Sequence, residues 1–78
     1  MKDLTKIIFK QIEKECANYG FDFGLTETHY GIGRINSLVL LESLIGLLNL
    51  QNDYEVFIET QRIDDEIKYY VSGERKDV

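Results

Sequence analysis

Hydrophobic positions follow a helical period in the first part of the chain. Four apolar residues recur every fourth position and share one helix face: Leu4, Ile8, Ile12 and Cys16. A stripe with this spacing is typical of an amphipathic helix that packs one face on a core. Asp3 can cap such a helix and Gly20 can end it, so the pattern predicts a first helix between these two residues.

The period is lost in residues 18–35. Glycines recur at short intervals there, at positions 20, 24, 31 and 33, and glycine favours backbone conformations that other residues avoid. The alternation of Phe21, Phe23 and Leu25 would suit a short strand. We favour a long loop, in which the aromatic and aliphatic side chains anchor the segment on a helical core.

A second helical pattern runs from Leu38 to Leu50 and is unusually apolar. Asn36 or Ser37 can cap it. One stripe consists of Leu38, Leu41, Ile45 and Leu48, and the opposite face is only weakly polar: Val39, Glu42, Ser43, Gly46 and Asn49. A helix of this kind either lies at the centre of the fold or exposes part of its surface to a partner.

The last third of the chain fits two patterns. Residues 54–60 alternate as a strand would, whereas Ile63, Ile67 and Tyr70 have helical spacing. Asp64 and Asp65 would suit the first turn of that helix. A hairpin would need its turn in residues 61–65, which lack glycine and the Asn-Gly signal. We therefore expect a closing helix.

Composition limits the classes of function. Seventy-eight residues indicate one small domain, which we expect to be a monomer. Its net charge of −5 disfavours nucleic acid as a partner and favours a basic protein surface. The single cysteine, Cys16, excludes an internal disulfide and fits a buried position. No segment resembles a signal peptide or is long enough to span a membrane, so a cytoplasmic location is expected.

The residues that could support catalysis are few. His29 is the only histidine, and no serine–histidine–aspartate arrangement can be built without it. The pair Asp64-Asp65 lacks the further ligands that a metal site needs, and Gly31-Ile32-Gly33 is too short for a phosphate-binding loop. The sequence predicts neither an enzyme nor a metal site.

Ser37 lies near the middle of this acidic chain and opens the apolar helix, with a leucine directly after it. Together with the first helix, the anchored loop and the acidic segment Asp53-Tyr54-Glu55-Val56, this arrangement resembles the acyl carrier protein family. The resemblance covers most of the chain and marks it as a divergent member. It implies that residues 1–78 form a single carrier-protein-like domain. It implies an all-α fold: a small four-helix bundle with a long loop between helices one and two.

The same resemblance implies a function. Ser37 would carry a covalent 4′-phosphopantetheine arm, attached by a phosphopantetheinyl transferase, and acyl or aminoacyl groups would travel on the arm as thioesters in fatty acid or polyketide biosynthesis. Acyl-transferring and acyl-activating enzymes would be the further partners. Six residues around the serine would contact them: Asn36, Leu38, Val39, Glu42, Ser43 and Gly46. Glu42 is the only acidic residue of this helix, which implies a partner surface more apolar than is usual in the family.

A second hypothesis assigns the chain to another class. If residues 54–71 form a C-terminal hairpin, the protein is a small α+β interaction or inhibitor protein that binds a basic partner through its acidic second half. Ser37 would then be only a helix cap. A third hypothesis is self-association through the apolar helix.

Overall fold

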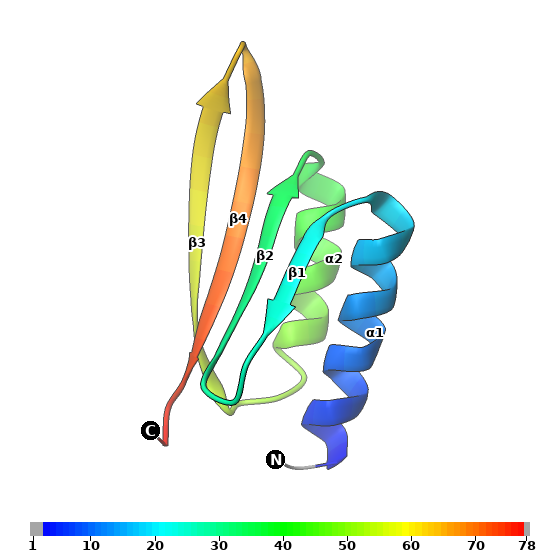
Figure 1. Ribbon diagram of the computed structural model, residues 1–78, viewed down its shortest axis with the longest axis vertical. Helices are drawn as coiled ribbons and strands as arrows, with labels where there is room; N and C mark the ends of the chain where they lie inside the picture. Colours follow the sequence, from blue (N-terminus) through cyan, green and yellow to red (C-terminus); the bar gives the residue numbers. More distant parts are fainter. Residues whose placement is uncertain (1–2, 78) are drawn as a thin grey trace.

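The computed structural model describes residues 3–77 and shows an α+β fold. The two helices are α1 (Asp3–Tyr19) and α2 (Leu38–Leu48) (Figure 1). The four strands are β1 (Asp22–Leu25), β2 (His29–Ile35), β3 (Tyr54–Ile63) and β4 (Glu66–Arg75). The expected all-α four-helix bundle is therefore wrong, because two of its expected parts, the long loop and the closing helix, are β-hairpins.

The strands form one antiparallel sheet in the order β1-β2-β4-β3. Both helices cover the same face of this sheet and lie over β1 and β2 (Figure 1). No helix or strand within residues 3–77 covers the opposite face, here called the open face. Because the order places β1 and β3 at the two ends, each of these strands has one edge with no neighbouring strand among residues 3–77.

The core lies between the two helices and the covered face of the sheet. Its buried side chains come from both helices, from β2, β3 and β4, and from Phe21 just before β1: Ile8, Phe9, Ile12, Cys16, Phe21, Tyr30, Ile32, Ile35, Leu41, Leu44, Leu48, Tyr54 and Val71. Phe23 of β1 is partly buried against them. Strand residues that share this face with Val71 also include Ile58 and Ile67, which are exposed. The core therefore ends well before the tip of the β3–β4 hairpin.

The first helix and its end agree with the sequence pattern. Ile8, Ile12 and Cys16 are buried as predicted, although Leu4 is exposed. Gly20 has a φ of +73°, and Phe21 N–H donates to the Cys16 carbonyl at 2.9 Å. This is the hydrogen bond of a Schellman motif, in which a glycine in the left-handed conformation closes the helix.

Residues 18–35 do not form the expected loop. Phe23 pairs with Ile32 and Leu25 with Tyr30, so β1 and β2 form a hairpin. The alternation of Phe21, Phe23 and Leu25 was the correct signal, because Phe23 and Leu25 lie on the covered face of the sheet and face α1. A bulge between Ile32 and Ile35, with Arg34 at a φ of 59°, then directs Ile35 into the core.

The expected closing helix is wrong for a local reason. Asp64 and Asp65 have φ values of 51° and 65°, so they form the two-residue turn of the β3–β4 hairpin instead of the first turn of a helix. Two successive positive φ values match a type I′ turn, which Asn-Gly usually provides. Aspartate can adopt this conformation at a modest cost in free energy. The chain therefore forms this turn although its sequence lacks the Asn-Gly dipeptide.

Gly73 joins the hairpin to the core at a very close contact. It pairs with Tyr30, and a Cβ at this position would lie 1.8 Å from the Tyr30 ring. The Tyr30 ring also packs 5.1 Å from Phe9 and 5.3 Å from Tyr54, between centroids. Only glycine lets the aromatic cluster of Phe9, Tyr30 and Tyr54 fit against β4.

Candidate interaction surfaces

Ser37 caps α2 in the structure. Its backbone is extended, and its hydroxyl oxygen accepts a hydrogen bond from Leu40 N–H at 3.4 Å. The Ser37 side chain is half-buried. The predicted start of the second helix is thereby confirmed, and the Ser37 hydroxyl has a capping role there.

The six residues expected to contact carrier-protein partners are all exposed: Asn36, Leu38, Val39, Glu42, Ser43 and Gly46. Four of them, at positions 39, 42, 43 and 46, follow the helical period and share the outer face of α2. Val39 is 74% exposed. The structure therefore brings these residues together on one surface, although that surface belongs to a helix packed on a sheet.

The β3–β4 hairpin projects beyond the helices and beyond β1 and β2 (Figure 1). The pairing of β2 with β4 stops at Ile35–Tyr69, so residues 61–68 form a two-stranded ribbon, here named the distal ribbon. Ile63 and Ile67 of the distal ribbon are 49% and 46% exposed. A two-stranded ribbon is marginally stable by itself, so the distal ribbon depends on the sheet at its base.

The open face of the sheet carries an aromatic side chain among carboxylates at the base of the hairpin. Phe57 is 47% exposed, and along its own strand it lies between Glu55 and Glu59 on the same face. Glu74 lies directly opposite Glu55 on β4. We name this group of one phenylalanine and three glutamates, Glu55, Phe57, Glu59 and Glu74, the Phe57 patch.

The cross-strand pair Glu55–Glu74 is electrostatically unfavourable, because like charges directly opposite each other destabilise a sheet. The Nε2 of His29 lies 3.9 Å from a Glu74 carboxylate oxygen, and the two side chains form an ion pair only when the histidine is protonated. The His29 Nδ1 is 2.6 Å from the Thr28 hydroxyl, so the ring is held beside the patch. The Phe57 patch therefore combines the negative charge of its three glutamates with the exposed apolar side chain of Phe57.

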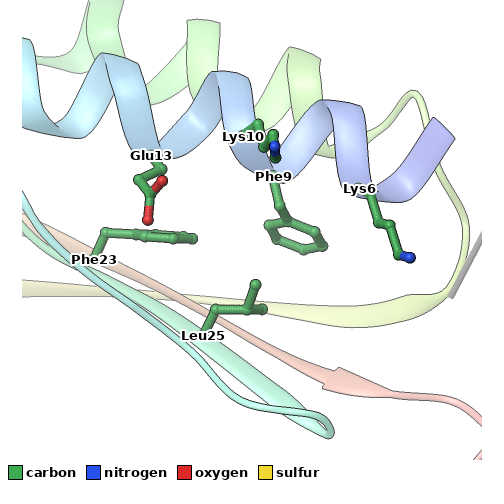
Figure 2. A pocket seen from close by; sticks show the side chains of 6 residues that line it. All are labelled: Lys6, Phe9, Lys10, Glu13, Phe23 and Leu25. Atoms are coloured by element: carbon green, nitrogen blue, oxygen red, sulfur yellow. The ribbon is translucent and has the colours of Figure 1, made fainter. Parts of the chain in front are cut away.

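A groove of about 270 Å³ lies between α1 and β1 (Figure 2). Its floor consists of Phe9, Phe23 and Leu25, and its helical rim carries Lys6, Lys10 and Glu13. Figure 2 shows Lys6, Phe9, Lys10 and Glu13 along α1, with Phe23 and Leu25 of β1 below them. Neither lysine makes an ion pair within the part of the chain that the structure describes.

The remaining reactive groups serve the fold. Burial, with a smaller contribution from Glu15, raises the pKa of the Cys16 thiol to about 11, so this cysteine is held in its neutral form. A hydrogen bond from Arg34 lowers the pKa of the Asp22 carboxyl, at an exposed pair with an N–O distance of 2.8 Å. Among residues 3–77, histidine, cysteine and carboxylate side chains form no group of three or more that could hold a metal ion.

Comparison of the chain with models of protein families, with curated proteins and with solved structures finds no match in any of the three. Among the described helices, none is long and apolar enough to cross a membrane.

The sequence did not indicate the groove or the Phe57 patch. Both combine residues from separate elements: Phe9 of α1 with Phe23 of β1, and Glu55 of β3 with Glu74 of β4. The alternation in residues 54–60 was a usable signal for β3, since it placed Phe57 between two glutamates on one face.

Proposed function

We propose that this chain is a small, non-catalytic interaction module that binds a basic protein partner through the β3–β4 hairpin. The observation that carries the proposal is the Phe57 patch, an exposed aromatic side chain that shares the open face of the sheet with three glutamates, two on its own strand and one diagonally across on β4. A partner's lysine or arginine can lie between the carboxylates, and its apolar neighbour can cover the ring.

The charge distribution supports this choice of surface. Between Tyr54 and Arg75 the chain holds six acidic residues and three basic ones, a net charge of −3 out of −5 for the whole chain. A cation bound between Glu55 and Glu74 removes the repulsion of that cross-strand pair, so binding gains free energy that the isolated protein lacks. The excess charge also accelerates the encounter with a basic surface.

The carrier function stays an alternative prediction that rests on Ser37. The bundle implied by the resemblance is contradicted, and the Ser37 hydroxyl has a capping role. We therefore prefer the interaction module, and a direct test of the serine is given in the Discussion.

The test of the interaction module uses a blocked ten-residue peptide of alternating lysine and valine, titrated into isotope-labelled protein. Amide resonances of Glu55, Phe57 and Glu74 should shift saturably, and added salt should weaken the binding. The triple variant Glu55→Gln/Glu59→Gln/Glu74→Gln should bind at least about tenfold more weakly, as expected for three lost charge contacts.

The matched control removes the same charge from the helices, in the triple variant Glu13→Gln/Glu15→Gln/Glu42→Gln. Its affinity should change less than about twofold, because these carboxylates lie away from the open face. An equal loss in both variants would show that the peptide responds only to net charge, and the proposed site would be wrong.

A further inference from the structure

We propose that the open edge of β1 and the adjacent groove bind an extended acidic peptide segment, which adds to the sheet as a fifth strand. This site is separate from the Phe57 patch and selects the opposite charge. The proposal rests on three features of the described residues: free backbone groups on β1, an apolar groove beside them, and two lysines without ion-pair partners at the groove's rim.

The backbone groups of β1 can be assigned from its hairpin. Thr26 N–H donates to the His29 carbonyl at 2.8 Å, and bonded and non-bonded pairs alternate along an antiparallel ladder. Gly24–Gly31 is then a bonded pair, whereas Phe23–Ile32 and Leu25–Tyr30 are not. The N–H and C=O groups of Phe23 and Leu25 therefore point away from β2, toward the open edge.

The side chains of the same two residues form the groove floor together with Phe9. A strand added beside β1 would place every second side chain on the face that α1 covers, next to these three residues. Peptide recognition by strand addition uses this combination: main-chain hydrogen bonds provide affinity, and a cavity for alternate side chains provides specificity. A volume of about 270 Å³ suits two medium-sized aliphatic side chains.

The lysines define the chemistry of the peptide. Lys6 and Lys10 are one helical turn apart on the side of α1 that faces the groove, and both are exposed (Figure 2). In a chain with a net charge of −5, the charged side chains that line the groove are two lysines and one glutamate, Glu13, so the groove itself has a net charge of +1. It favours a segment whose inward positions combine aliphatic residues with glutamate or aspartate.

The test titrates isotope-labelled protein with a blocked nine-residue peptide, Thr-Glu-Thr-Val-Thr-Ile-Thr-Glu-Thr. We expect saturable shifts of the β1 amides at a dissociation constant below about 1 mM. The decisive readout is hydrogen exchange, because the Phe23 and Leu25 amides face solvent in the free protein. Their exchange should slow at least about tenfold in the complex, which an ion or a side-chain contact would not cause.

Two pairs of variants separate the contributions. Lys6→Gln/Lys10→Gln should weaken binding about three- to tenfold, whereas Lys14→Gln, an exposed lysine on α1 that does not line the groove, should change it less than twofold. Leu25→Pro removes an edge N–H that no other described residue uses, and an edge strand tolerates proline. It should abolish the slowed exchange at Phe23, whereas Leu25→Ala should weaken binding and retain the slowed exchange.

Four outcomes of the peptide titrations would overturn the proposal. These are no binding, equal binding of a peptide with lysine in place of glutamate, no effect of Leu25→Pro, and saturable displacement of the peptide by octanoate. The last would identify a small-molecule site for apolar carboxylates. Sedimentation must also show a monomer at the concentrations used, because pairing of β1 with β3 of a second copy would equally slow exchange at the β1 edge, and a dimer would contradict the proposal.

Discussion

The distal ribbon and the base of the sheet are made from the same two strands but differ in what surrounds them. At the base, Val71 of β4 lies between β2 and β3 and is buried beneath the helices. In the distal ribbon, Ile67 lies on the same face of the same strand and is 46% exposed. Stability is therefore concentrated at the base, and the ribbon presents an apolar surface that the fold does not use.

The largest expected effect concerns the position that joins the two regions. Gly73→Ala should destabilise the protein by about 3 kcal/mol or more, because the added Cβ would overlap the buried Tyr30 ring. Gly31→Ala is the control, since a Cβ there meets no atom within 4 Å, and it should be close to neutral. Chemical denaturation of both variants measures the difference. Equal stability of the two would show that Tyr30 can move aside.

A pair of isoleucine truncations compares the two regions directly. Ile32→Ala should cost about 2–3 kcal/mol, because Ile32 is 2% exposed in the core and its loss leaves a cavity. Ile67→Ala should cost less than about 1 kcal/mol, because its side chain is already half in solvent. The free energy of unfolding in urea gives both values. Similar costs would mean that the ribbon contributes to the core.

Ser37→Ala should reduce stability by about 1 kcal/mol, the usual cost of a lost helix cap. The same variant tests the carrier function. Wild-type protein incubated with coenzyme A and a promiscuous phosphopantetheinyl transferase should not gain the mass of the arm. A gain that Ser37→Ala abolishes would establish the carrier function and contradict the interaction module.

The smallest expected effect concerns the tip of the ribbon. Asp64→Asn with Asp65→Gly should stabilise the hairpin by about 0.5–1 kcal/mol, because both positions have positive φ values that Asn-Gly adopts more readily. Amide exchange of residues 61–68 should slow, while exchange in α1 stays unchanged. A loss of stability would show that the aspartate side chains support the turn.

Sequence patterns predicted those parts of the fold whose signals are local. Gly20 ends α1 and Ser37 caps α2, and both act within one helical turn of their own position. The patterns failed where the decisive contact is distant. β4 pairs with β2 through contacts such as Tyr30–Gly73, more than 40 residues apart, and nothing in Ile63–Tyr70 distinguishes a strand from a helix without that partner.

The same distinction applies to the sites. Exposure of Val39 and Glu42 followed from the weakly polar face of the second helix, as the sequence indicated. Predicting the groove would have required knowing that Phe9 of the helix layer faces Phe23 of the sheet. That arrangement depends on the β1–β2 hairpin. Lysines at positions 6 and 10 look like ordinary solvent-exposed residues until that hairpin is placed beside them.

The contact between Gly73 and Tyr30 also has an evolutionary consequence. Their atoms compete for one volume, so a side chain can grow at either position only if the other shrinks. In chains that descend from the same ancestor, a residue larger than glycine at position 73 should therefore occur together with a residue smaller than tyrosine at position 30. Substitutions at the two positions should therefore co-vary, although 42 residues separate them in the chain.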